Sequence, residues 1–264
     1  MRLLFFVLLI FSFDAQSKVP EPGYGLPELA SEARIKELNA KKRAKVMTPS
    51  VQRKMQRVLE ALDEAGILEQ EQALLKKEKK DKEAEAKDKE IAKAIANGQR
   101  ELDDLKSRLA SLQSYDRSMY YYYAAYYNLA YQDKISEAMN NYVKLVAEKD
   151  TAEKLRINAY YVLAQLYLSE SNYESGLDYL LRWFKNAAEV NPDGYVLLGQ
   201  AYYLLADKES TKSKVLASYQ KAYNNMVEAK RLADEKQIRF RENWYSLLLA
   251  SMGELDLKNE QVPV

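Results

Sequence analysis

The sequence predicts an all-α protein, a solenoid of helix pairs preceded by a charged helical segment, and three observations support this fold class. The chain of 264 residues contains only 8 Gly and 6 Pro, and it is rich in Ala, Leu, Glu and Lys, which favours long helices over sheets. Residues 76–90 form a dense block of balanced charge. Two segments of the C-terminal half repeat each other at a spacing that is typical of helical solenoids.

Composition also excludes several kinds of chemistry. The chain has no Cys and no His, which excludes Cys nucleophiles, Ser-His triads, thiolate or imidazole metal sites and disulfides. The formal net charge of +1 provides no basic field for nucleic acid. A glycosidase would require two carboxylates beside aromatic side chains that stack on a sugar, and no such pair is evident on the inner face of the predicted helical repeats. We therefore expect a protein that is not an enzyme and has no cofactor, metal, nucleic acid or small-molecule substrate.

Residues 1–17 are predicted to be a signal peptide. Arg2 precedes an apolar run from Leu3 to Phe13, and Ala15-Gln16-Ser17 gives the small-x-small pattern that precedes cleavage. The run is short for a bilayer span, which needs about 20 residues, although an uncleaved anchor is the alternative. No Cys follows the run, so a lipoprotein is excluded. We expect export, which in a bacterium with two membranes places the mature chain in the periplasm.

Two segments separate the signal peptide from the repeats. Residues 18–47 are predicted to be a flexible tether, because Pro and Gly are frequent in their first half. Residues 48–113 are predicted to contain a first helix followed by a charged, partly heptad-like helical segment. Thr48 and Pro49 provide a capping hydroxyl and a Pro at the first helical position. The apolar spacing that follows predicts a helix that ends at Gly66.

The charged segment allows more than one interpretation. Between Lys76 and Glu90, 13 of 15 residues are charged, and such blocks are usually solvated faces. Beyond it, apolar residues at alternating steps of three and four resemble about three heptads over residues 91–112. This seam predicts either a coiled coil, through which the chain would self-associate, or a helix that folds back in an antiparallel pair. A solvated helix with one apolar stripe packed on its neighbour is the simplest alternative.

Residues 114–264 are predicted to form the solenoid itself. The segments AYYVLAQLYL (159–168) and GYVLLGQAYYLL (194–205) superpose at four pairs of positions, each 35 residues apart: Tyr160 on Tyr195, Leu163 on Leu198, Ala164 on Gly199, and Tyr167 on Tyr202. An aromatic residue, a Leu, a small residue and a Tyr at this spacing are typical of tetratricopeptide (TPR) repeats, whose period is about 34 residues.

Further repeat positions follow from this register. SNYESGLDYLLRWF reads as a second helix, with a capping box predicted from Ser171 to Glu174 and Gly176 at the close approach of two helices. Trp244 stands at the aromatic position of a further first helix. The residues assigned to packing between repeats are Tyr160, Leu163, Ala164, Tyr167, Gly176, Tyr195, Leu198, Gly199, Tyr202 and Trp244.

A tyrosine-rich segment, MYYYYAAYYNLAY (119–131), raises the question of which faces its rings occupy. Successive helical residues point about 100° apart, so Tyr120, Tyr123, Tyr127 and Tyr131 share a face that we assign to helix packing. Another face carries aromatic residues assigned to an inner groove. By the repeat geometry, the predicted partner-binding groove consists of Tyr122, Tyr126, Asn158, Tyr161, Gln165, Leu168, Val196, Gln200 and Tyr203. The amides among them suit pairing with a peptide backbone.

Several sequence segments also resemble a known family. EKLRINAYYVLAQLYLSESNYESGLDYLLRWF, NPDGYVLLGQAYYLL and ENWYSLLLA are similar to the periplasmic tetratricopeptide-repeat proteins associated with TonB systems. TPSVQRKMQRVLEAL resembles the first helix of that family and SYDRSMYYYYAAYYNLAY its next repeat. The resemblance covers about residues 45–65 and 114–252. It implies an accessory scaffold of a TonB energy-transduction system for outer-membrane uptake of iron-siderophore ligands.

The resemblance also implies the partner. A component of the TonB complex, or a peptide segment of it, would lie in the groove of the solenoid. Two features depart from the family: residues 67–113 are longer than its usual connection, and fewer repeats follow Trp244, which is the pattern expected of a C-terminally truncated solenoid. The alternative is a coiled-coil-plus-repeat protein of the Tol system or of the cell-wall synthesis machinery. Trimerisation through residues 91–112 would favour that alternative.

Overall fold

The computed structural model describes residues 24–40 and 45–257, and in these ranges the chain is helical, with no strand. The helices, in chain order, are α1 (Glu32–Asn39), α2 (Pro49–Lys77), α3 (Asp81–Ser107), a short 3-10 helix η1 (Leu109–Ser111), α4 (Ser114–Tyr131), α5 (Ile135–Ala147), α6 (Glu153–Ser169), α7 (Tyr173–Asn186), α8 (Pro192–Ala206), α9 (Lys212–Glu235) and α10 (Glu242–Glu254). The predicted all-α class is thus confirmed for these ranges.

The predicted signal peptide, residues 1–17, lies outside the described residues. Within the described ranges, no helix combines the length and apolarity needed to cross a membrane. The chain divides into two compact units, which we treat separately. The larger unit comprises residues 27–190, and the smaller unit comprises residues 191–264 together with the N-terminal residues as far as Leu26.

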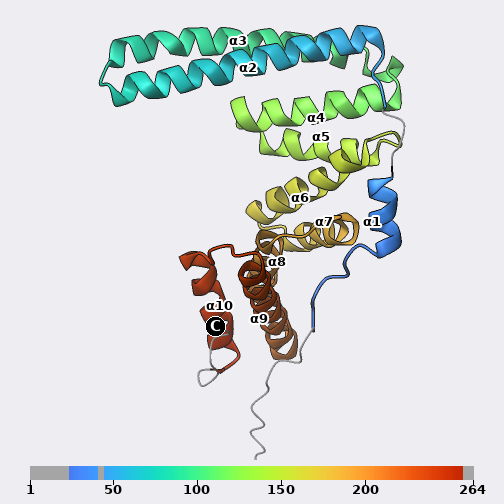
Figure 1. The fold of residues 1–264 in the computed structure, drawn as a ribbon, viewed down its shortest axis with the longest axis vertical. Helices are drawn as coiled ribbons and strands as arrows, with labels where there is room; N and C mark the ends of the chain where they lie inside the picture. Colours follow the sequence, from blue (N-terminus) through green and yellow to red (C-terminus); the bar gives the residue numbers. More distant parts are fainter. Residues whose placement is uncertain (1–23, 41–44, 258–264) are drawn as a thin grey trace, which may run out of the picture. The chain divides into compact units, whose positions relative to one another are not determined.

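In the larger unit, α2 to α7 form three helix pairs that stack in sequence order (Figure 1). Helix α2 packs along α3, α4 along α5, and α6 along α7, while α3 also contacts α4 and α5 contacts α6. Each pair therefore covers a face of the next pair, which is the arrangement of a helical solenoid.

The pair α2–α3 is a long antiparallel hairpin. Helix α2 continues through Gly66 to Lys77 and α3 begins at Asp81, so the charged block of residues 76–90 surrounds the hairpin turn. The prediction that the helix ends at Gly66 is wrong. A glycine in a helix interior costs only about 1 kcal/mol relative to Ala. Buried residues before Gly66, including Met55 and Ala65, pack in the core, and beyond it Gln72 and Glu71 make polar contacts with α3.

The apolar seam predicted for residues 91–112 is filled within the chain. Leu102 and Leu105 are fully buried, and Ile95, Leu109 and Leu112 pack against the same core. Of the interpretations that the sequence leaves open, the structure shows the one in which the segment folds back as an antiparallel pair.

Tyrosines of α4 form much of the core between α3, α4 and α5. Tyr120 and Tyr127, on the face predicted to pack, are buried, and Tyr123 and Tyr131 pack partly buried against them. The rings of Tyr127 and Tyr131 meet edge to face with centroids 5.5 Å apart. Gly98 of α3 makes room for Tyr127, because an added Cβ would overlap its hydroxyl and come within 2.7 Å of its Cζ.

The pair α6–α7 shows the close approach predicted at Gly176. A Cβ at this glycine would lie 2.7 Å from Leu168 of α6. The helix begins one residue later than the predicted capping box: Asn172, not Ser171, is the N-cap of α7, and its side chain accepts a hydrogen bond from the Ser175 N–H at 3.2 Å. Ser171 instead takes a left-handed conformation with φ 59° in the turn that follows α6.

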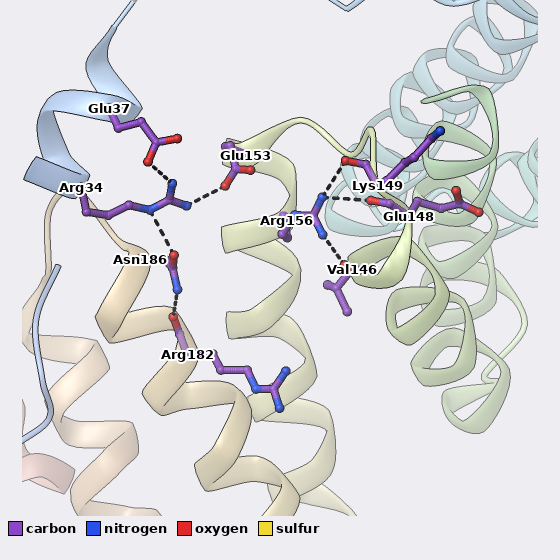
Figure 2. A network of polar contacts seen from close by, with 9 residues as sticks. All are labelled: Arg34, Glu37, Val146, Glu148, Lys149, Glu153, Arg156, Arg182 and Asn186. Atoms are coloured by element: carbon purple, nitrogen blue, oxygen red, sulfur yellow. Dashed lines mark hydrogen bonds and ion pairs between the residues drawn. The ribbon is translucent and has the colours of Figure 1, made fainter. Parts of the chain in front are cut away.

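Two arginines bind the ends of helices in the larger unit (Figure 2). Arg156 of α6 donates to the backbone carbonyls of Val146, Glu148 and Lys149, which lie at the C-terminal end of α5 where carbonyls lack helical partners. Arg34 of α1 donates to Glu37, to Glu153 of α6 and to the Asn186 side chain of α7. The segment predicted as a tether therefore includes a helix, α1, that is held by polar contacts and has no buried residue.

In the smaller unit, α8 and α9 form a further helix pair and α10 packs against α9 and α8. Asn191 is the N-cap of α8, with Pro192 in its first turn. Gly199 of α8 lies against Met226 of α9, whose sulfur would be 2.9 Å from an added Cβ. Trp244 of α10 is buried in the contact with these helices.

Candidate binding site

A cavity of about 480 Å³ opens between α3, α4 and α5 of the larger unit. Its lining residues recur at helical spacing, so that one stripe of each helix faces the cavity. Helix α4 contributes Tyr120, Ala124 and Asn128 at steps of four residues. The other lining residues are Gln99, Leu102, Asp103, Lys106, Gln132, Lys134, Glu137, Asn140, Asn141 and Lys144.

Amide side chains are the most frequent polar groups of this cavity. Gln132 donates to the Oε1 of Gln99 at 2.7 Å, and Gln99 donates to Asp103 at 2.9 Å. Three asparagines, Asn128, Asn140 and Asn141, form no side-chain hydrogen bond with any residue that the structure describes. Each carries both a carbonyl acceptor and an NH₂ donor, so these three groups are available to a ligand.

Charges of both signs surround the amides. Asp103 and Glu137 contribute carboxylates, and Lys106, Lys134 and Lys144 contribute ammonium groups. Burial, together with the nearby Asp103 carboxylate, raises the pKa of Tyr120 to about 12. The Tyr120 hydroxyl therefore stays protonated at neutral pH and keeps its ability to donate a hydrogen bond.

This arrangement is suited to recognition of an extended chain. An asparagine amide can pair with both the C=O and the N–H of a peptide backbone, and mixed charges can select side chains of either sign. Among the described residues, no group of three or more carboxylates is placed to hold a metal ion.

The predicted groove residues of the larger unit lie elsewhere than this cavity. Tyr122 meets Tyr123 at 5.1 Å and packs against the core, whereas Tyr126 is 42% exposed. On α6, the ring centroids of Tyr161 and Trp183 are 4.9 Å apart. Leu168 packs against Gly176. The side chains of Asn158 and Gln165 are exposed.

The remaining predicted groove residues belong to the smaller unit. Tyr203 meets Tyr219 of α9 at 5.2 Å, Val196 is partly buried and Gln200 is exposed. The nine predicted residues are thus divided between two units, and the cavity includes none of them.

The residues assigned to repeat packing are inside the helix pairs. Tyr160, Tyr167 and Tyr202 are partly buried, and the Tyr167 ring stacks on Tyr179 of α7 at 5.5 Å. The fully or nearly fully buried members are Leu163, Ala164, Gly176, Tyr195, Leu198, Gly199 and Trp244.

Sequence reasoning missed the cavity amides. A signal for them exists in Asn140-Asn141, because asparagine has low helix propensity and two in succession inside a helix are unfavourable without another role. The contribution of α3 carries no such signal. It follows from the folding back of residues 81–107 beside α4, which the sequence left as one of several interpretations.

No family model, curated protein sequence or solved structure matches this chain.

Proposed function

We propose that this protein is a binding scaffold whose larger unit holds an extended segment of a partner protein in the cavity between α3, α4 and α5. The observation that carries the proposal is the set of asparagines at positions 128, 140 and 141, which face the cavity without a hydrogen-bond partner among the described residues. Asn128 and Asn141 are partly buried and Asn140 is exposed. A bound peptide would withdraw these amides from water, which costs about 1–3 kcal/mol for a group without a partner, and its backbone supplies donors and acceptors for each amide.

The resemblance of the sequence to periplasmic tetratricopeptide-repeat proteins supports a more specific proposal. We infer that the helix pairs are of the tetratricopeptide type, that the mature chain is periplasmic, and that the partner is a component of a TonB complex that powers iron-siderophore uptake. The stacking of α2 to α7 in pairs agrees with a repeat scaffold. The trimeric alternative has less support, because the apolar seam of residues 91–112 packs inside the chain.

A titration tests the cavity and the partner together. The mature chain, residues 18–264, is titrated with the periplasmic part of TonB from the same organism, followed by calorimetry or fluorescence anisotropy. We expect saturable binding, and we expect Asn128→Ala with Asn141→Ala to weaken it at least about tenfold, which corresponds to about 1.4 kcal/mol. The matched control is the double variant Asn158→Ala, Gln165→Ala, which removes two exposed amides of α6 and should leave the affinity unchanged.

Two results would contradict the proposal at different points. If the α6 variant loses binding and the cavity variant keeps it, the partner binds at the sequence-predicted groove. If no saturation occurs up to about 50 µM, a range in which weak specific complexes are still detected, TonB itself is not the partner.

A further inference from the structure

Residues Tyr24–Leu26 lie on α9 within the smaller unit, although they are separated from it by almost the whole chain. The side-chain amide of Asn224 donates to the backbone carbonyl of Tyr24 at 2.8 Å, and that of Asn225 donates to the carbonyl of Gly25 at 3.1 Å. Both hydrogen bonds are made to backbone carbonyls of the segment and not to its side chains. Tyr24 and Gly25 form a turn, and amide side chains that donate to successive carbonyls can hold the backbone of such a peptide turn.

Side chains add selectivity to these backbone contacts. The ammonium group of Lys221 lies 5.7 Å from the ring centroid of Tyr24 and 5.2 Å from that of Tyr202. The cation is therefore shared by an aromatic ring of the segment and one of α8.

The central residue of the segment must be glycine. Gly25 has φ +75°, a left-handed conformation that side chains rarely adopt. A Cβ at this position would also overlap the Lys221 side chain, reaching its Cγ and coming within 2.8 Å of its Cβ. The surface thus accepts an aromatic residue followed by glycine and excludes larger residues at the second position.

One atom of the site is left without a partner. Asn225 is fully buried, and its amide donates both to Gly25 and to the Lys221 carbonyl, yet its Oδ1 accepts no hydrogen bond. A buried acceptor without a donor is costly. A segment that also presents a backbone N–H to this oxygen would satisfy the site more completely than Tyr24–Leu26 does.

We propose that this α9 surface, formed by Lys221, Asn224 and Asn225 with Tyr202 of α8, is a second peptide-binding site, which takes a protein segment that turns at an aromatic–glycine pair. Residues Tyr24–Leu26 occupy it as an intramolecular ligand that the external segment must displace. The proposal is independent of the α3–α5 cavity, because the two sites lie in different units. Because Tyr24–Leu26 belong to the same chain as α9, an external segment has to compete with an intramolecular ligand.

The test opens the site in the full chain and offers the same segment from outside. The probe is a fluorescently labelled peptide with the sequence of residues 20–30, measured by anisotropy against wild type and Gly25→Ala. The variant cannot seat its own segment, so we expect it to bind the peptide at least about tenfold more tightly than wild type, in which only a small fraction of sites is open. Gly66→Ala is the matched control, because an added Cβ there meets nothing within 4 Å, and it should bind as wild type does.

Two further variants make the result decisive. Tyr24→Ala opens the site by a different route, without backbone strain, and should also increase peptide binding. Adding Asn225→Ala to Gly25→Ala should abolish the increase, as should a peptide in which Gly25 is replaced by Ala. Circular dichroism melting checks that each variant is folded. Equal peptide binding by all variants, or no binding by Gly25→Ala and Tyr24→Ala up to about 1 mM, the weak limit of specific affinity, would overturn the proposal.

Discussion

Glu148 follows the last turn of α5 and accepts hydrogen bonds from two residues of α4. Arg117 donates to its two oxygens at 2.6 and 2.8 Å, and the Ser114 hydroxyl donates at 2.8 Å. The hydrogen bond from Arg117 is the largest cause that lowers the pKa of Glu148 from its ordinary value of 4.5, and this effect outweighs partial burial, which raises the pKa. A carboxylate held in this way connects the two helices of a pair.

This geometry predicts a pH dependence of stability. A carboxyl whose pKa is lowered by folding stabilises the folded chain above its unfolded pKa, and that contribution is lost as the pH falls through the folded pKa. We expect Glu148→Gln to lower stability at pH 7 by about 1–3 kcal/mol and to reduce the loss of melting temperature between pH 5 and pH 3. Asp178→Asn, which removes an exposed ion pair with Arg182, is the control and should leave the pH profile unchanged. Parallel profiles for Glu148→Gln and wild type would refute this role of Glu148.

Thr48 illustrates what local sequence specifies and what it does not. The Thr48-Pro49 pair correctly predicts where α2 begins, because the conformational limits of Pro are local. The Thr48 hydroxyl, predicted to cap the helix, instead donates to Asp116 of α4 at 3.0 Å. That partner is distant in sequence, so only the packing of α2 on α4 determines it.

At the scale of helices, two glycines of one hairpin have opposite roles. Gly66 of α2 has open space around it, whereas Gly98 of α3 lies against the buried Tyr127. Gly66→Ala should stabilise the fold by about 0.5–1 kcal/mol through helix propensity. Gly98→Ala should destabilise it by about 1–3 kcal/mol, because the tyrosine ring has to shift in a packed core. Urea unfolding of both variants measures the difference, and the same sign of change in both would contradict the packing described for Gly98.

Helical periodicity predicted which segments become helices and which repeat positions are buried, as at Leu163 and Leu198. It failed at Gly66, where tertiary contacts outweigh a weak local preference. Helical periodicity could not predict the candidate cavity for a related reason. Asn128 and Asn141 lie on adjacent helices, but Gln99 and Asp103 reach the same space only because α3 returns along α2, and periodicity alone does not distinguish that return from an intermolecular coiled coil.

The whole molecule contains two units, and each has one of the two tryptophans: Trp183 in the larger and Trp244 in the smaller. Trp183→Phe and Trp244→Phe therefore give reporters of single units by fluorescence. Leu198→Ala should lower the free energy of unfolding reported by Trp244 by about 2–5 kcal/mol, the usual cost of a core cavity. The free energy of unfolding reported by Trp183 should not change. Leu163→Ala should do the reverse. If either substitution shifts both transitions equally, the two units unfold as one.

The division of the smaller unit along the chain has a consequence for the order of synthesis. Tyr24–Leu26 are made before residues 27–190, and α9, which they bind, is made after them. Gly25 and Asn225 are 200 residues apart, so at about 5–20 residues per second roughly 10–40 s separate the two events. The occupant of the α9 site is thus translated well before its receptor, so the contact between them forms only after residues 27–190 and α9 have been made.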